Sequence, residues 1–223
     1  MASLGCLTLL VLGGVLLPLL LFALFANLVT TSFHQLGLTP TGALVLFLLS
    51  LFGGFVNFPL YSRRVERSPE SAAHLGLFYY RPPAVGRQVV ALNLGGAIVP
   101  LVFSGYLFWN GVPLASTLGA VAAVALAARL SSRTLPGVGI GVPVFIPPLI
   151  AVGFALLLAR QDAAPVAYIA GALGTLIGAD LLNFNAIRKM GPQVVSIGGA
   201  GVFDGIFLTA VASALVAQFL GAR

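Results

Sequence analysis

Long apolar runs separated by short polar connectors make up most of this sequence. A helix needs about 20 apolar residues to cross a bilayer, and runs of that length recur along the chain. The runs are continuous instead of alternating between apolar and polar positions, which favours helices over the strands of a β-barrel. The predicted spans cover residues 4–30, 41–60, 88–109, 113–130, 138–159, 164–184 and 194–220.

Composition places this whole pattern in a membrane. Of the 223 residues, 59% are hydrophobic and 7% are charged, whereas about 25% of the residues in a soluble domain are charged. So few polar side chains cannot cover a water-facing surface, and the lipid bilayer is therefore an expected partner. We predict the all-α class: a polytopic membrane helix bundle of about seven transmembrane spans, forming a single transmembrane domain over residues 1–223.

The basic residues set the predicted orientation. The connector at 61–87 carries five arginines. Because cytoplasmic connectors are enriched in Lys and Arg, we expect 61–87 to be a cytoplasmic loop and the topology to be N-in, C-out. Threading the other spans from this loop places nine of the eleven basic residues on the cytoplasmic side. No basic stripe with interleaved aromatic residues is present, so nucleic acid is not an expected partner.

Two aspartates, Asp180 and Asp204, lie inside the last two predicted spans. A charged residue at the centre of a bilayer costs at least about 2.5–3.5 kcal/mol, so intramembrane acids usually face a cavity or a polar partner. The one basic residue within the predicted spans, Arg129, lies one residue from the end of the span at 113–130, so none lies near the centre of a span to pair with them. These two acids are the strongest functional signal in the sequence.

The two aspartates are predicted to lie at similar depth in the cytoplasmic half of the membrane. Asp180 precedes Arg188 by eight residues, about 12 Å of helix, and Asp204 follows Gln193 by eleven, about 16 Å. Asn183, three residues after Asp180, shares its helical face and is a candidate hydrogen-bond partner. A pair of carboxyl groups in close contact shares a proton, so one can act as base and the other as acid.

A second signal is the density of prolines and glycines at 136–148 (PGVGIGVPVFIPP). This composition predicts a broken helix, and irregular backbone at membrane depth is tolerated only where it is buried in protein or lines a cavity. Its unpaired backbone groups are suited to an extended peptide or an ion. The residues predicted to bind substrate are Pro143, Phe145, Pro147, Asn183, Gly199 and Gly201.

Further interruptions occur where the second predicted span ends and the third begins. Asn57 and Asn93 are the polar residues there, and hydrogen bonds between helices are their expected role. The two histidines, His34 and His74, fall in connectors on opposite sides, so no metal site is expected. We expect no cofactor either, since no nucleotide-binding fingerprint is present.

Four motifs occur in order: NLGGAIVP at 93–100, PGVGIGVPVFIPP at 136–148, GADLLN at 178–183 and GGAGVFDGIFL at 198–208. In these motifs the sequence closely resembles a family of bacterial and archaeal integral membrane proteins classed as a domain of unknown function. The resemblance covers roughly residue 57 to the C-terminus. It implies a multi-pass protein of a prokaryotic cytoplasmic (inner) membrane.

The sequence also resembles, less closely, the intramembrane aspartyl proteases of the presenilin and signal-peptide-peptidase class. Those enzymes place one Asp in each of two adjacent spans, the second in a Gly-x-Gly-Asp motif. Here GAGVFD at 199–204 has the glycines, and Asp204 comes two residues later than in that motif.

The leading hypothesis is a di-aspartyl intramembrane hydrolase, a peptidase acting on membrane-embedded helices, with Asp180 and Asp204 as catalytic residues. A transmembrane peptide is then the expected substrate. The alternative is a proton- or cation-coupled transporter or channel that uses the same aspartates as carriers. The third interpretation is a non-catalytic membrane scaffold, in which each aspartate is a hydrogen-bonding residue between packed helices.

Overall fold

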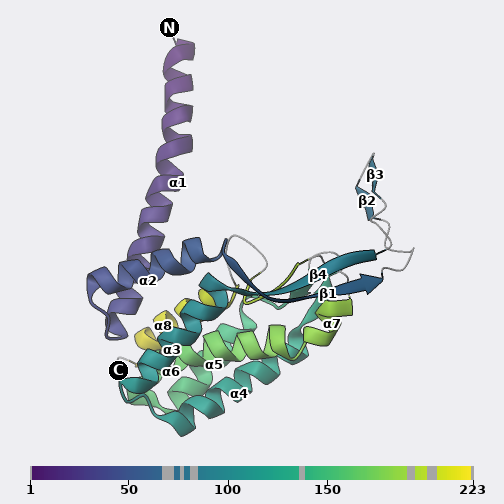
Figure 1. Cartoon of the computed structure of the whole chain (residues 1–223). Coiled ribbons are helices and arrows are strands. Elements are labelled where there is room, and N and C mark those ends of the chain that lie inside the picture. The colour runs from purple at the N-terminus through teal and green to yellow at the C-terminus, as the bar shows by residue number, and fades with distance from the viewer. Residues whose placement is uncertain are drawn as a thin grey trace. The chain divides into compact units, whose positions relative to one another are not determined.

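The computed structural model describes residues 2–66, 73–75, 78–80, 85–135, 139–189, 194–199 and 205–221 (Figure 1). The chain divides into two compact units, Met1–Leu48 and Leu49–Arg223. The first unit contains α1 (Ala2–Gln35) and most of α2 (Pro40–Gly53). These two helices pack through aromatic side chains, because the ring of Phe47 lies 6.2 Å from that of Phe22 and 6.0 Å from that of Phe25.

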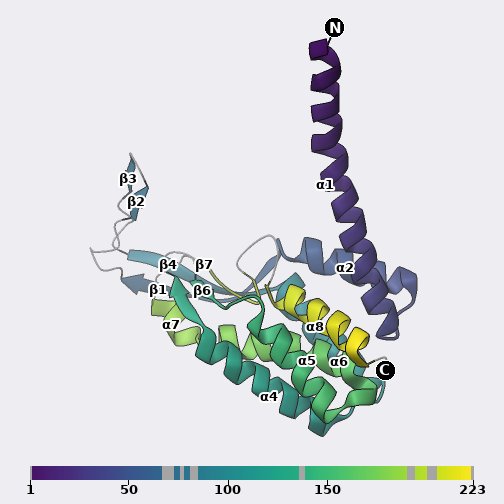
Figure 2. The ribbon, with the colours of Figure 1, turned by 180° about the vertical axis from the view of Figure 1, so that it is seen from behind.

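The second unit is a helix bundle with a small sheet at one end (Figure 2). One interrupted helix runs through the middle of this bundle and contacts α3, α4, α5 and α8. Its segments are η2 (Arg160–Asp162), α6 (Ala163–Ile169), η3 (Ala170–Gly174) and η4 (Leu176–Leu181). The helices around it are α3 (Val99–Trp109), α4 (Leu114–Ser131), α5 (Ile146–Leu158) and α8 (Gly205–Gly221), and the short α7 (Phe184–Lys189) follows it.

Small residues allow the central helix to pack closely on α4. A Cβ atom added at Gly174 would come within 2.5 Å of the Val124 side chain. One added at Gly178 would overlap the carbonyl oxygen of Ala125. Such contacts between small residues and a neighbouring backbone are typical of helices packed in a membrane. The central helix is therefore held against α4 along its length.

The described helices are those of a membrane protein. Three are long and apolar enough to cross a bilayer: Gly14–His34, Leu114–Ser131 and Arg160–Leu181. Shorter apolar helices cover Pro40–Gly53, Leu94–Trp109, Ile146–Leu158 and Ile206–Leu220. The prediction of a mainly helical membrane protein is confirmed at this level.

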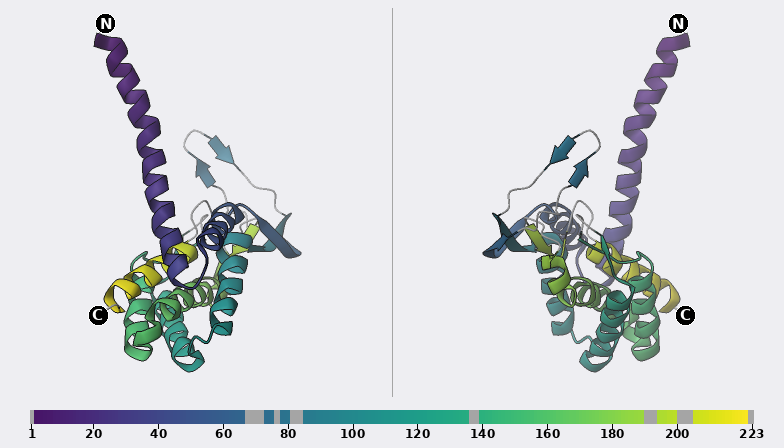
Figure 3. Two further views of the ribbon diagram at one scale, coloured as in Figure 1. Left: turned by 90° about the vertical axis from the view of Figure 1, so that its left-hand side faces the viewer. Right: turned by 90° about the vertical axis from the view of Figure 1, so that its right-hand side faces the viewer.

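The sheet joins three segments that are far apart in the sequence. Strand β4 (Val85–Asn93) is central, with β1 (Asn57–Glu66) antiparallel on one side and β7 (Val194–Ile197) parallel on the other. The β1–β4 ribbon extends from one end of the bundle in Figure 1 and lies at the edge of the helices in the two views of Figure 3. The described strands also form two short hairpins, β2 (Ala73–Leu75) with β3 (Phe78–Tyr80), and β5 (Arg133–Leu135) with β6 (Gly139–Gly141).

The sheet corrects the predicted fold class and three predicted span boundaries. Residues 57–60, 88–93 and 194–197 were expected to be helical, and the ends of 61–87 were expected to be loop, yet these residues form strands. Paired β-branched residues such as Val89 with Val194 favour a sheet, and Pro59 is tolerated because β1 is an edge strand. The chain is thus mainly helical but not all-α.

The prediction of a broken helix at 136–148 is confirmed where the structure describes it. Residues 139–141 form β6, residues 142–145 are irregular, and α5 begins at Ile146. The two prolines after Ile146 lie in the first turn of α5, where the missing N–H groups have no helical acceptor. Residues 136–138 lie outside the described part of the chain.

Candidate functional site

Asp180 lies at the end of the central helix, where the bundle meets the sheet. It belongs to η4, a π-helical segment, and π-helical turns inside α-helices are frequent at functional sites. The side chain is partly buried. One of its carboxyl oxygens, Oδ2, accepts a hydrogen bond of 2.6 Å from the backbone N–H of Gly198. The carboxyl group is thereby fixed to the segment that follows β7.

Gly198 can make this bond because of its unusual backbone conformation. Its φ of +84° lies in the left-handed region, which glycine adopts at little cost. There is also no room for a side chain, because a Cβ atom would lie 2.7 Å from the backbone nitrogen of Ala97. The turn after β7 is therefore packed on η1 (Leu94–Ile98) while its N–H points at Asp180.

Asn93 organises a second polar cluster beside this turn. Its side chain is almost fully buried, at 1% exposure. Its Nδ2 donates to the carbonyl oxygen of Gly54 at 2.8 Å and to Oδ1 of Asn57 at 3.2 Å. Its Oδ1 accepts from the backbone N–H of Gly96 at 2.9 Å, which caps the start of η1. One side chain thus joins β1, β4 and η1.

The two clusters meet at residues 198–199. Ser196 of β7 donates from Oγ to Oδ1 of Asn57 at 2.5 Å. Gly199 packs on Asn93, since a Cβ atom there would lie 2.9 Å from the side-chain carbon Cγ of Asn93. Polar groups from the ends of β1, β4, β7 and η4 are thus concentrated at the junction of sheet and bundle.

Asn183 has a different role from the predicted one. We expected it to bond Asp180, but its Nδ2 donates to the carbonyl oxygens of Gly178 and Ala179, both at 3.0 Å, and to Oγ of Ser132 at 3.1 Å. These bonds close the end of the central helix and tie it to the end of α4. Asn183 is therefore a helix-terminating residue beside the site.

The other predicted substrate-binding residues are distributed unevenly. Pro143 and Phe145 are exposed, Phe145 at 78%, whereas Pro147 is buried in the first turn of α5. The strand that precedes them, β6, contacts η4, as does β7. Two short strands therefore contact the helical segment that carries Asp180.

The second predicted acid, Asp204, lies outside the described residues, and so does Gly201. The described chain resumes at Gly205 with α8, whose Ile206 and Phe207 are buried. Within the described part of the chain, no group of three or more His, Cys, Asp or Glu residues could hold a metal ion.

The residues at this junction belong to a segment of the chain that matches a known protein family. The family model described as "Protein of unknown function (DUF1614)" matches residues 51–216. The chain belongs to this family. No curated protein and no solved structure matches it.

The DUF1614 match includes every residue of both polar clusters and excludes α1 and most of α2. The family segment thus begins close to the boundary between the two compact units, at Leu49. Asn57 and Asn93 were recognised from the sequence as polar residues at a span boundary. Ser196 and Gly198 were missed as partners, because residues 194–197 were predicted to belong to a helical span and the donor at Gly198 is a backbone N–H.

Proposed function

We propose that this protein is a membrane-embedded peptide hydrolase in which Asp180 and Asp204 form the acid and base. The observation that carries the proposal is the hydrogen bond from Gly198 N–H to Asp180 Oδ2. It ties the acid of the central helix to a segment that lies six residues before Asp204 in the sequence. Backbone donors that fix a carboxylate in this way pre-organise it for proton transfer.

The chemistry needs only the two carboxyl groups and water. The ionised carboxylate takes a proton from water while the water oxygen bonds to the carbonyl carbon of the peptide. The protonated carboxyl group donates its proton to the carbonyl oxygen. Collapse of the tetrahedral diol intermediate breaks the C–N bond: the leaving nitrogen takes the proton that the first carboxylate received from water, and one hydroxyl of the diol returns a proton to the second carboxylate.

The contacts of η4, the segment that carries Asp180, with β6 and β7 support a peptide substrate. A helix must unwind before its backbone can be hydrolysed, and an unwound peptide leaves N–H and C=O groups that need partners. The irregular residues 142–145, which include Pro143 and Phe145, follow β6 directly. They would contact the chain of an unwound substrate.

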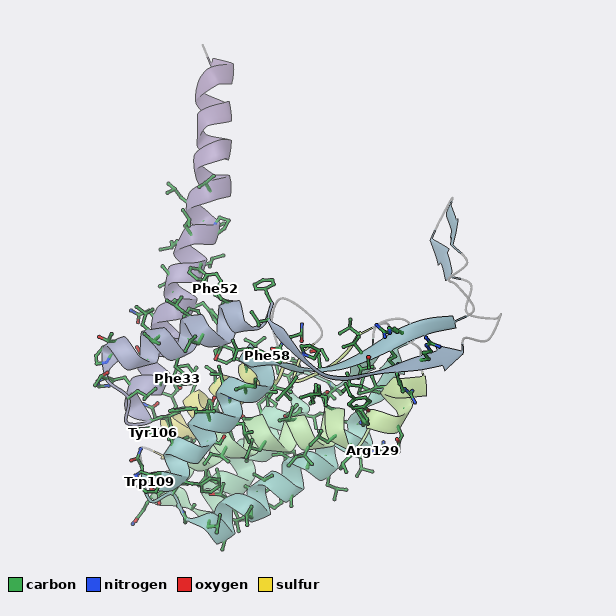
Figure 4. All side chains as sticks on the ribbon, in the orientation of Figure 1. Phe33, Phe52, Phe58, Tyr106, Trp109 and Arg129 are labelled. Carbon is green, nitrogen blue, oxygen red and sulfur yellow. The ribbon has the colours of Figure 1, made fainter. Side chains whose placement is uncertain are left out.

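We place the protein in a prokaryotic cytoplasmic membrane with seven spans and the N-in, C-out topology. The structure's two ends support this orientation. Figure 4 shows Trp109 at one end of the second unit and Arg129 at the other. Trp109 suits a membrane interface, and the end with Arg129 is also where β5 follows α4 with Arg133, so two basic residues lie together there.

The test uses the full chain reconstituted in liposomes with a synthetic helical peptide long enough for a single span. The peptide has a central Gly-Pro interruption, with a fluorophore on one side of it and a quencher on the other, so that cleavage raises the fluorescence. We expect cleavage by the unaltered protein. Asp180→Asn and Asp204→Asn should each lower kcat about a hundredfold to ten-thousandfold, as for other acid–base residues. Asp162→Asn is the matched control, because Asp162 is exposed in η2. Cleavage that persists in Asp204→Asn would contradict the mechanism.

A second readout does not depend on turnover. A hydroxyethylene analogue of the same peptide resembles the tetrahedral intermediate and should bind more tightly than the peptide itself. We expect each Asp→Asn variant to lose this difference while its melting temperature stays near that of the unaltered protein. Equal binding of analogue and peptide by all three proteins would argue against a hydrolytic site.

Proton-coupled transport is the second candidate, and two buried hydroxyl groups favour it. Ser104 and Thr175 are 1% and 5% exposed, and their hydroxyl oxygens have no hydrogen-bond partner among the described residues. Buried polar groups of this kind often hold water. A transporter predicts that Thr175→Val lowers proton flux in liposomes, whereas a hydrolase predicts unchanged peptide cleavage. A scaffold predicts that the Asp→Asn changes alter only the melting temperature.

A further inference from the structure

The exposed end of the β1–β4 ribbon brings two arginines together. Arg64 and Arg87 are directly opposite each other in the antiparallel register, so their side chains leave the same face of the ribbon. Directly opposed residues have Cβ atoms about 4.5–5.5 Å apart, and like charges at this spacing destabilise a strand pair. Both residues are exposed. No hydrogen bond or ion pair joins either guanidinium group to another described residue.

On the opposite face of the ribbon, the arginine of β1 has a hydrogen-bond partner within the protein. Arg63, one residue earlier on β1, faces Gln88 and donates from Nε to its Oε1 at 2.9 Å. Gln88 and Val90 are buried, at 2% and 1% exposure, so this face packs on the rest of the unit. One arginine of β1 is thus satisfied within the protein, while the Arg64–Arg87 pair presents two positive charges outward.

The composition of β1 indicates what lies beside this pair. The strand begins with exposed apolar residues, Phe58 at 48% and Leu60 at 58%, continues through Tyr61 at 45%, and becomes basic at Arg63 and Arg64. This order of side chains, apolar first, then tyrosine, then arginine, matches the order of environments in a bilayer from the acyl chains through the interface to the headgroups. Tyr61 and Arg64 are three residues apart, about 10 Å of strand. The headgroup layer on each side of a bilayer is about 5–8 Å thick, so for a strand that runs along the membrane normal with Tyr61 at the interface, the flexible side chain of Arg64 is within reach of the lipid phosphates.

We infer that Arg64 and Arg87 form a binding site for the phosphate of an anionic membrane lipid. Two guanidinium groups side by side match the oxygens of a phosphodiester and can bind it with parallel hydrogen bonds. The bound anion removes the repulsion between the two arginines. The inference does not rest on hydrolysis at Asp180, because the pair lies at the other end of β4 from Asn93.

The test is thermal unfolding of the purified full chain in uncharged detergent, with phosphatidylglycerol or phosphatidylcholine added to the micelles. Phosphatidylglycerol should raise the melting temperature and phosphatidylcholine should not. In the Arg64→Gln/Arg87→Gln variant, the concentration of phosphatidylglycerol for half of the effect should rise at least about tenfold, as for the loss of a charge-assisted contact. Arg160→Gln, which removes an exposed charge outside the sheet, should respond like the unaltered protein.

Charge reversal separates lipid binding from damage to the ribbon. Arg87→Glu replaces two like charges by an ion pair with Arg64, so the melting temperature without lipid should not fall, and the response to phosphatidylglycerol should be lost. Arg64→Lys/Arg87→Lys should keep part of the response, because lysine retains the charge without the bidentate geometry.

Three results would overturn the inference. They are equal stabilisation by the two lipids, an unchanged response in the double Gln variant, and equal stabilisation by millimolar inorganic phosphate, which would identify free phosphate as the ligand.

Discussion

At the scale of single residues, the site depends on one glycine in the left-handed region. Gly198 combines a φ of +84°, contact with the backbone of Ala97, and donation of its N–H to Asp180. Each of these would be disturbed by a side chain. We expect Gly198→Ala to lower the free energy of unfolding by about 1–3 kcal/mol, measured by thermal or chemical unfolding in detergent.

The control for this change is Gly153→Ala in α5. A Cβ atom at Gly153 would meet no atom within 4 Å, and alanine is the better helix former. Gly153→Ala should therefore leave stability unchanged or raise it slightly. If the two substitutions had the same effect, the turn after β7 would not hold the conformation that positions Asp180.

Asn93 is a second residue whose role emerges only in the fold. Its amide group makes three hydrogen bonds with groups that are 3, 36 and 39 residues away in the sequence. A buried amide that satisfies both of its ends is costly to replace, because removing it leaves several backbone and side-chain groups unpaired. The sequence identifies Asn93 as polar at a span boundary but gives no information about these partners.

At the scale of elements, the register of β1 and β4 is the feature most open to test. In a background with Cys6→Ser, the pair Arg64→Cys/Arg87→Cys should form an internal disulfide on oxidation, because the two positions face each other. The pair Arg63→Cys/Arg87→Cys should remain reduced, because these side chains leave opposite faces. Free thiols are counted by alkylation and intact mass. Equal oxidation of both pairs would show that these residues do not form the paired strands.

The same elements show where reading of the sequence succeeded and where it failed. Continuous apolar runs predict both ends of α4 and of the central helix, and the C-terminal ends of α3, α5 and α8, within a few residues, because burial in lipid and helix formation use the same pattern. The runs do not show where a helix gives way to a strand. Residues 89–92 are wholly apolar and continue into the apolar helix after them, and only pairing with β1 and β7, which are distant in the sequence, makes them a strand.

The candidate site was predicted in part for a similar reason. An acid in an apolar run is visible in a single sequence, so Asp180 could be selected without a structure. Its described partner, the N–H of Gly198, is a backbone group, and no side chain marks it. At Asn183 the sequence suggested the wrong partner. Helical spacing indicated a hydrogen bond to Asp180, but the side-chain amide donates to backbone carbonyl oxygens of the last helical turn instead.

At the scale of the whole molecule, the two ends of the helix bundle give a test of orientation. The turn after α3 and the turn after α5 lie at one end, since Oγ of Ser116 near the start of α4 donates to the carbonyl oxygen of Leu158 at 3.0 Å. The β5–β6 hairpin follows the other end of α4. If the basic end is cytoplasmic, the first two turns face outward and the hairpin faces inward.

Single cysteines at Asn110, Gln161 and Arg133 in the Cys6→Ser background report these positions. An impermeant maleimide should label Asn110→Cys and Gln161→Cys in intact spheroplasts, and Arg133→Cys only after the membrane is opened. The reverse result would invert the orientation and place Asp180 and the Arg64–Arg87 pair on the outer side. Labelling of Asn110→Cys but not of Gln161→Cys would mean that the turns before α4 and after α5 are not on the same side of the membrane, so α4 and α5 do not each cross it once. That result would exclude seven spans, because each of the two must cross once for the basic residues to gather on one side.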